Sequence, residues 1–341
     1  MPIFMIGTQR SGSNLLRLML NQLPDIVAPH PPHILHRMMP IMPSYGDLHS
    51  DNNFAALVDD VCRMVELNPV PWTDVTFDRK KVAADCRERS LVAVFGAVYQ
   101  VLSGTRGTKT WLCKSMQNTL FLPQIEAYYA SAKYIYLFRD GRDVALSFRK
   151  AVVGEKHFYH IAREWADSQR LALAHRAIVA AERFIGVSYE ELTAQPEPTM
   201  QRLCTFLGAQ YHPSMLEYHT SDEAKRAADA SALWGNVVKP IMTDNTRKFL
   251  REASPDDVSI FESVAGDVLD ALGYDRVYVR RGEERKFKTT DLRFFDFENK
   301  RLKEEVLQGV DQEDLKRRDR QATLIAEIRG RPPMAAAAAQ P

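Results

Sequence analysis

The residues best suited to chemistry in this sequence lie near its start, in the segment 7–14 (GTQRSGSN). Gly12 lets a ligand approach the backbone closely, and Arg10 supplies a permanent positive charge on a planar guanidinium group. Further side-chain donors are available from Ser11, Ser13 and Asn14. A loop of this kind between a strand and a helix points backbone N–H groups at an anion. The segment therefore predicts a phosphate-binding loop.

The spacing of the glycines narrows the kind of phosphate chemistry. Gly7 and Gly12 match the first half of the nucleotide-binding pattern G-x-x-x-x-G-K-[ST], but Ser13 stands where that pattern has its lysine. That lysine reaches the β- and γ-phosphates, so its replacement argues against ordinary ATP chemistry. A purely structural alternative is that Ser13 or Asn14 caps a core helix.

A second polar segment, 139–143 (RDGRD), follows an apolar run in the middle of the chain, and Ser147 comes shortly after it. If Arg139 ends a strand, Ser147 is expected at the start of the next helix. A guanidinium group and a hydroxyl could then hold one phosphate from two sides through charge-assisted hydrogen bonds. The alternative for 139–143 on its own is a salt-bridged turn at the surface.

Strands and helices are expected to alternate around these two segments. Apolar, β-rich runs predict strands over 3–6, 110–113, 133–138 and 184–188. The spacing of apolar residues predicts helices over 15–23, 119–130, 160–183 and 200–207. This alternation predicts an α/β protein whose mostly parallel sheet lies between two layers of helices.

The composition excludes several classes of protein. Among the 341 residues, 45 Lys and Arg balance 44 Asp and Glu, which does not favour a dedicated nucleic-acid or polybasic membrane binder. The longest apolar stretch, 91–102, is too short to span a bilayer, and no signal-peptide pattern opens the chain. The four cysteines form no C-x-x-C pattern, so neither a disulfide framework nor a cysteine-rich zinc site is indicated. We therefore expect a soluble cytoplasmic protein.

Three segments together resemble those of a known enzyme family. The run 134–147 (YIYLFRDGRDVALS) strongly resembles the 3′-phosphate motif of sulfotransferases, which use 3′-phosphoadenosine 5′-phosphosulfate (PAPS). The segment 8–15 (TQRSGSNL) resembles their 5′-phosphosulfate loop, and 187–192 with 203–208 resembles a third recurrent segment. The agreement covers about residues 3–275. The resemblance implies a P-loop-like three-layer fold, with a central parallel sheet flanked by helices, and a sulfotransferase that needs no metal.

The resemblance also implies roles for individual residues. Arg10 takes the place of the family's loop cation at the bridge of the phosphosulfate, and Lys114 that of a lysine that contacts the moving sulfuryl group. Arg139 and Ser147 are assigned to the 3′-phosphate, and Tyr189 matches a position near the adenine. The contacts with the 5′-phosphate are assigned to Ser11, Gly12, Ser13 and Asn14.

Two positions depart from the family pattern, and one of them leaves the catalytic base open. Leu15 replaces a tryptophan that stacks on adenine, and Met116 stands where the catalytic histidine would be. Some family members instead place a glutamate base close to the position of His30. Here His30 and His33 stand among prolines that restrict the backbone, and histidine can accept a proton at neutral pH. We expect His30 to be the base and His33 to be the second candidate, the alternative for each being a histidine that only shapes the pocket.

The residues that complete the pocket are less clearly marked. His36 and Arg37 are further candidates beside the two histidines. A loose match places Lys239 in a basic loop that closes over the nucleotide, with a surface lysine as the alternative. No motif identifies the acceptor, which we expect to be a hydroxyl or amine of a small molecule, lipid or glycan.

The chain is predicted to divide into three parts. Residues 1–278 form the sulfotransferase domain, 279–331 a charged and mostly helical extension packed on the body or on a second subunit, and 332–341 a disordered tail. Two other functions fit parts of the sequence. One is a P-loop nucleotide or small-molecule kinase, against which the missing loop lysine counts; the other is a non-catalytic nucleotide-binding protein of the same fold, which Met116 favours.

Overall fold

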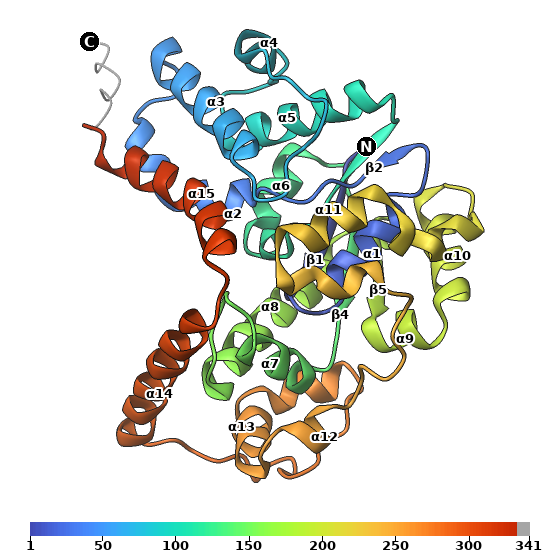
Figure 1. Cartoon of the computed structure of the whole chain (residues 1–341), viewed down its shortest axis with the longest axis vertical. Coiled ribbons are helices and arrows are strands. Elements are labelled where there is room, and N and C mark those ends of the chain that lie inside the picture. Colours follow the sequence, from blue (N-terminus) through green and yellow to red (C-terminus); the bar gives the residue numbers. More distant parts are fainter. Residues whose placement is uncertain (333–341) are drawn as a thin grey trace.

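The computed structural model describes residues 1–332, which are built around a five-stranded parallel sheet (Figure 1). The strands are β1 (Ile3–Gly7), β2 (Ile26–Val27), β3 (Thr110–Cys113), β4 (Lys133–Phe138) and β5 (Phe184–Ser188), in the order β2-β3-β1-β4-β5. β1 pairs with β4 along its whole length, from Ile3 opposite Lys133 to Gly7 opposite Leu137. The four predicted strands are confirmed. β2 was not predicted, because two residues show no periodic pattern.

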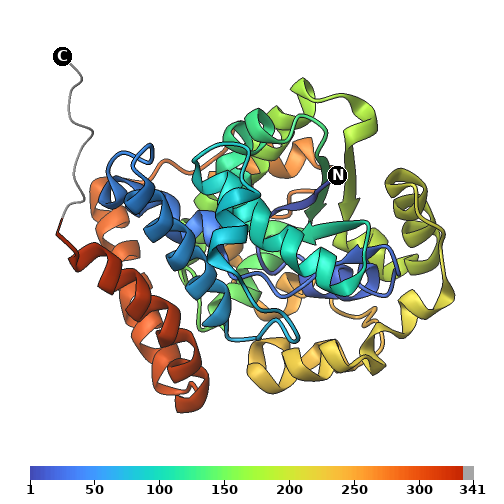
Figure 2. The same cartoon turned by 90° about the horizontal axis from the view of Figure 1, so that it is seen from above.

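Helices cover both faces of the sheet, which is why β1 is buried throughout. Successive side chains of a strand point to opposite faces. Accordingly Phe4 and Tyr134 belong to one apolar core, and Met5 and Ile135 belong to the other. The predicted three-layer α/β fold is confirmed, and Figure 2 shows the sheet between its helical layers.

Each core is supplied by its own set of helices. The core on the Phe4 face contains residues of α2 (Ile34–Met38), α3 (Asp51–Glu66), α4 (Arg79–Ala84), α5 (Leu91–Arg106) and α6 (Leu122–Tyr128). The core on the Met5 face contains residues of α1 (Ser13–Leu20), α9 (Tyr189–Ala194), α10 (Pro196–Leu207) and α11 (Asp222–Ala230). A third cluster joins α7 (Gly141–Arg149), α8 (Phe158–Ile178), α12 (Phe249–Glu252) and α13 (Pro255–Ala271). Short 3-10 helices connect these elements: η1 (Met39–Tyr45), η2 (Met116–Phe121), η3 (Ala181–Arg183), η4 (Pro213–Thr220) and η5 (Ala232–Val238).

All four predicted helices have different boundaries in the structure. α1 (Ser13–Leu20) and α10 (Pro196–Leu207) begin earlier than the predicted 15–23 and 200–207, and the other two differ more. In place of one helix over 119–130, the chain forms η2 and then α6, because Pro123 occupies the first turn of α6, where its missing N–H costs no hydrogen bond. The helix predicted over 160–183 ends at Ile178, since Val179 turns to an extended conformation with ψ 152°.

The C-terminal extension forms two helices, α14 (Thr289–Gln308) and α15 (Gln312–Gly330). Leu324 and Ile328 of α15 are buried in the core on the Phe4 face, and Figure 1 shows α15 beside α3. The extension is therefore packed on the body of the protein. Most of the segment predicted to be disordered, 333–341, lies outside the described residues. None of the described helices is long and apolar enough to cross a membrane.

Candidate functional site

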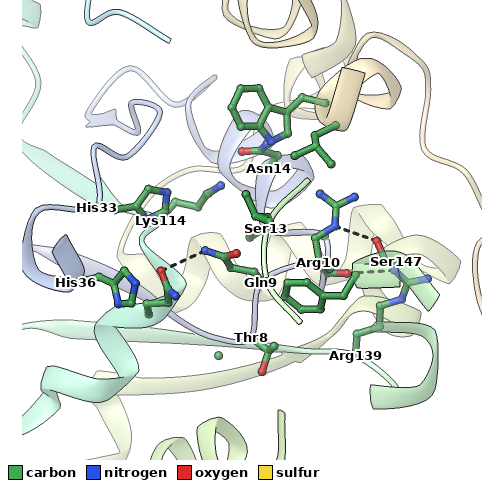
Figure 3. A pocket seen from close by; sticks show the side chains of 18 of the residues that line it. Thr8, Gln9, Arg10, Ser13, Asn14, His33, His36, Lys114, Arg139 and Ser147 are labelled. Atoms are coloured by element: carbon green, nitrogen blue, oxygen red, sulfur yellow. Dashed lines mark hydrogen bonds between the residues drawn. The ribbon is translucent and has the colours of Figure 1, made fainter. Parts of the chain in front are cut away.

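One large cavity, of about 1390 Å³, lies at the carboxyl ends of β1, β3 and β4 (Figure 3). Ligands of parallel α/β sheets bind at this edge, where loops join strands to helices. The cavity is lined by these residues predicted from the sequence: Arg10, Gly12, Ser13, Asn14, His30, His33, His36, Arg37, Lys114, Arg139, Ser147 and Tyr189. The two segments predicted to bind phosphate, more than a hundred residues apart in the chain, therefore line the same cavity.

The loop between β1 and α1 has an unusual backbone that opens the start of α1 to the cavity. Arg10 and Gly12 have positive φ angles of 69° and 86°. Gly12 is the N-cap of α1, and no side chain caps the helix with a hydrogen bond. The alternative in which Ser13 or Asn14 is the cap is therefore wrong. The first N–H groups of α1, at the positive end of the helix dipole, are left for a ligand.

Tyr189 ties this loop to the second phosphate-binding segment. A Cβ atom on Gly12 would lie 2.4 Å from Cδ2 of Tyr189, so only glycine allows this contact. The Tyr189 ring also lies against the guanidinium of Arg139, with 4.4 Å between its centroid and Cζ. The Tyr189 hydroxyl accepts a hydrogen bond of 3.0 Å from Nδ2 of Asn245, whose carbonyl in turn accepts from Arg139.

Arg139, Ser147 and Arg10 form one cluster, as Figure 3 shows. Nε of Arg10 donates to Oγ of Ser147 at 2.9 Å, and Nη1 of Arg139 donates to the carbonyl of Arg10 at 3.1 Å. Nε of Arg139 is buried and has no hydrogen-bond partner among the described residues. The expectation that Ser147 starts its helix is wrong: α7 begins at Gly141, directly after the turn, so Ser147 lies in its second turn.

The turn that carries Arg139 is salt-bridged, but it is buried rather than at the surface. Asp140 accepts from the backbone N–H of Arg142 and also pairs with its guanidinium at 2.8 Å. Arg142 forms a second ion pair, at 2.6 Å, with the buried Glu262. These pairs fix the turn, and Arg139, which follows β4, lines the cavity. The one ion pair of Arg139 among the described residues is a long one, of 3.8 Å, with Asp143.

Lys114 follows β3 and reaches the cavity from a buried position. Its pKa is lowered to about 7, first because burial penalises the charged ammonium and then because Arg17 and Arg10 repel it. The pKa of Arg10 is lowered to about 10 by burial and by the charge of Arg139. Cations held together in this way are stabilised by a bound anion, so the electrostatics of the cavity favour an anionic ligand.

His30 and His33 have different surroundings. The buried His30 ring packs edge-on against Trp234, with 4.4 Å between centroids, and neither of its ring nitrogens has a partner among the described residues. His33 has a positive φ of 58°, and its Nδ1 lies 2.9 Å from Oγ of Ser115. Burial, together with the charge of Lys114, lowers the pKa of both rings well below 6.5, so both are neutral at pH 7. A neutral imidazole is the form that accepts a proton.

Two predicted residues do not reach the cavity. Ser11 is fully buried and is not among the residues that line the cavity, although its neighbours Arg10 and Gly12 line it. Lys239 is exposed, because the chain leaves η5 in an extended conformation there, and Trp234 of η5 faces the cavity instead. The structure does not bring Lys239 together with the other site residues.

The sequence analysis missed the contribution of the C-terminal extension to the cavity. Arg318 and Gln321 of α15 line it opposite the phosphate loop and the histidines. Nothing in the sequence signals this, because a charged helix with thinly spaced apolar residues has the pattern of a solvated one. Among the described residues no group of three or more His, Cys, Asp and Glu side chains is placed to hold a metal ion.

Comparison with known proteins finds a family model and relatives that are all sulfotransferases. The model of the sulfotransferase family matches residues 2–213. Protein-tyrosine sulfotransferase A of Caenorhabditis elegans is 22% identical over 289 residues, which are 80% of this chain and 67% of that protein. The putative protein-tyrosine sulfotransferase of Caenorhabditis briggsae is 31% identical over 174 residues, 48% of this chain and 60% of that protein. The chain thus spans about two thirds or less of these two relatives.

Two solved structures are similar over most of the chain. One is the sulfotransferase domain from the curacin biosynthetic pathway, with a TM-score of 0.59 and 21% identity over 81% of this chain and 98% of that one. The other is the sulfotransferase domain of the Synechococcus PCC 7002 olefin synthase, with a TM-score of 0.55 and 20% identity over 81% and 95%. At this level of identity the likeness shows a common fold.

Proposed function

The chain belongs to the sulfotransferase family, and we propose that it transfers a sulfuryl group from PAPS to a hydroxyl or amine of a small molecule, lipid or carbohydrate. The observation that carries the proposal is that the loop at Gly12 and the cluster at Arg139 face one cavity. PAPS carries phosphate groups on both the 3′ and the 5′ oxygens of adenosine. A protein that binds it needs two phosphate-binding sites that one nucleotide can reach at the same time.

The polar groups of the cavity fit the charges of this donor. Arg139 and Ser147 are proposed to bind the 3′-phosphate, which would give the buried Nε of Arg139 the partner that it lacks among the described residues. The N–H groups at the start of α1, with Ser13 and Asn14, are proposed to bind the 5′-phosphate. Tyr189, packed between the two regions, is proposed to lie beside the adenine.

The reaction breaks the S–O bond to the oxygen that bridges sulfur and phosphorus and forms a bond from sulfur to the acceptor atom. The products are the sulfated acceptor and adenosine 3′,5′-bisphosphate. Negative charge develops on the bridging oxygen as it leaves, by analogy with phosphoryl transfer. Arg10 and Lys114 are the cations that we propose to stabilise it, because both line the cavity, Lys114 buried and Arg10 half-buried, where a fixed charge is more effective than in water.

A base must take the proton of the acceptor, and we propose His30 for this role, with His33 as the second candidate. His30 is supported by its two ring nitrogens, which have no partner among the described residues, so that in the neutral ring the unprotonated nitrogen can accept a proton. His33 is supported by Ser115, which orients its ring through Nδ1 and leaves Nε2 for a ligand. The two relatives add the phenolic hydroxyl of tyrosine to the range of proposed acceptors.

The proposal is tested by incubating the purified protein with ³⁵S-labelled PAPS and a small-molecule cell extract. We expect a labelled product together with an equal amount of adenosine 3′,5′-bisphosphate. In parallel, the protein is applied to immobilised adenosine 3′,5′-bisphosphate and to ATP with Mg²⁺. Retention on ATP alone would instead indicate a kinase, and retention on the bisphosphate with no labelled product from any extract would indicate a non-catalytic binding protein.

A further inference from the structure

Helix α15 of the C-terminal extension forms one wall of the cavity. It lies outside the part of the chain that matches the family, which ends at residue 213. The side chains that it contributes are Arg318, Gln321, Ala322, Ile325, Ala326 and Arg329. The wall combines small apolar side chains with positive charges, which suits a ligand that has both an apolar body and a negative charge.

This wall is held in place by buried contacts. Leu324 and Ile328 pack into the core, and Nε2 of Gln321 donates to the carbonyl of Met64 at 2.7 Å. The buried carboxylate of Asp314 accepts from Ser231 at 2.6 Å and from Nε of Arg318 at 2.7 Å. The contacts of Asp314 with Ser231, of Gln321 with Met64, and of Leu324 and Ile328 with the core attach α15 to the body of the protein.

Arg37, on α2, completes the positive region at this end of the cavity. Its Nε is buried without a hydrogen-bond partner, and no ion pair of its guanidinium occurs within residues 1–332. Burial, and the repulsion of Arg318, lower the pKa of Arg37. A half-buried cation that faces another cation and has no carboxylate of its own is the arrangement expected of a binding site for an external anion.

The position of Arg37 in the cavity indicates that it binds the acceptor and not the sulfuryl donor. In Figure 3, Arg10, Ser147 and Arg139 lie at one end of the pocket, and His33 and His36 lie at the other. Arg37 follows His36 on α2 and is thus at the histidine end. If the donor occupies the arginine end and transfers its sulfuryl group toward the histidines, the space beyond them belongs to the acceptor.

We propose that α15 is the wall of the cavity that selects the acceptor, and that the acceptor carries an anionic group, a carboxylate or a phosphate, bound by Arg37 with Arg318 opposite. The inference rests on the proposed function, since it assumes that the other end of the cavity holds the donor. Ala322 and Ala326 leave room for the body of the acceptor, and Ile325 gives it an apolar surface.

The test compares two phenols that differ only in charge, 4-hydroxyphenylacetate and 4-hydroxyphenylacetamide. Each is titrated calorimetrically into the full-length protein saturated with adenosine 3′,5′-bisphosphate. We expect the carboxylate to bind at least about tenfold more tightly, the scale of one charge-assisted hydrogen bond. Arg37→Gln should remove this preference, and Arg320→Gln, which deletes an exposed charge of α15 outside the cavity, should keep it.

A second pair of variants tests the wall itself. Ala326→Trp fills the cavity and should weaken binding of both phenols, whereas Thr323→Trp, at an exposed position of α15 that does not line the cavity, should leave both unchanged. Equal binding of the two phenols, binding of neither, or a preference that persists in Arg37→Gln would overturn the proposal. Binding of adenosine 3′,5′-bisphosphate is measured separately in the unmodified protein and in every variant. If the unmodified protein does not bind the bisphosphate, the proposed function is refuted instead.

Discussion

Nε of Arg10 donates a hydrogen bond of 2.9 Å to Oγ of Ser147, although 137 residues separate them in the chain. The two residues belong to the two different segments that we propose bind phosphate, one following β1 and the other following β4. Their contact places the proposed sites of the 5′- and 3′-phosphates next to each other. Because Arg10 and Ser147 are hydrogen-bonded to each other, a substitution of either residue is expected to weaken the contacts of the protein with both phosphates of the nucleotide.

Ser147→Ala is therefore expected to weaken binding of adenosine 3′,5′-bisphosphate by about 3- to 10-fold, the worth of one hydrogen bond of ordinary strength. The loss has two sources: the hydroxyl no longer contacts the phosphate, and Arg10 loses the group that orients it. Calorimetry with the bisphosphate measures the change. An unchanged dissociation constant would exclude Ser147 from the site.

Arg139→Ala is expected to reduce affinity for adenosine 3′,5′-bisphosphate by about 10- to 100-fold, because a charge-assisted contact with one phosphate is lost. Affinity for adenosine 5′-monophosphate, which lacks the 3′-phosphate, should change much less. The selectivity between these two ligands is thus the decisive measurement. Arg293→Ala, at an exposed position of α14, is the control for the loss of one positive charge. Equal losses for both nucleotides would contradict the assignment to the 3′-phosphate.

His30→Ala is expected to lower turnover by at least about 10²-fold, the usual contribution of a general base, with little effect on bisphosphate affinity. Because burial and the charge of Lys114 lower the pKa of His30, the base stays neutral at mildly acidic pH. The acid limb of the rate profile should therefore lie below pH 6.5, with the rate falling as pH falls. The same measurements on His33→Ala decide between the two histidines: the base is the one whose removal abolishes the acid limb.

Lys114 is expected to produce an alkaline limb. Its pKa of about 7 in the free protein means that the ammonium loses its proton as pH rises through neutrality. Because kcat/KM reports the ionisation of the free enzyme, kcat/KM for the donor should fall above about pH 7. Lys114→Arg should move this limb to higher pH, since a guanidinium keeps its charge. A profile that stays level between pH 7 and pH 9 in the unmodified protein would show that the charge of Lys114 is not needed.

Gly12→Ala is expected to weaken bisphosphate binding by at least about tenfold, since the new Cβ meets the Tyr189 ring at 2.4 Å and the residue needs a φ of 86°. Gly208→Ala is a matched control. Gly208 also has a positive φ, 72°, but a Cβ there has no neighbour within 4 Å. That variant should lose about 1 kcal/mol of folding free energy and keep its affinity for the nucleotide. Similar affinities for the two glycine variants would mean that the contact with Tyr189 does not shape the site.

Local features of the sequence were enough to predict four strands of the sheet and the two polar segments that line the cavity. The strands at 3–6 and 133–138 are runs of apolar β-formers, and the polar turns after them lie at one edge because parallel strands end together. The same reasoning failed for Ser147, whose place in the second turn of α7 depends on where that helix starts. For Lys239 the sequence left two alternatives, a ligand of the nucleotide and a surface lysine, and the structure has Lys239 exposed and outside the cavity lining.

By itself, therefore, the sequence determined which family the chain resembles and which segments are candidates for binding anions, since short-range pattern and spacing carry that information. Only the tertiary structure decided that Arg318 of α15 lines the same cavity as Arg37 and that Trp234 packs edge-on against His30. It alone decided, too, that the pKa of Lys114 falls to about 7. These properties depend on the distances between groups far apart in the chain and on their removal from water. Neither quantity can be predicted from a short segment of the sequence.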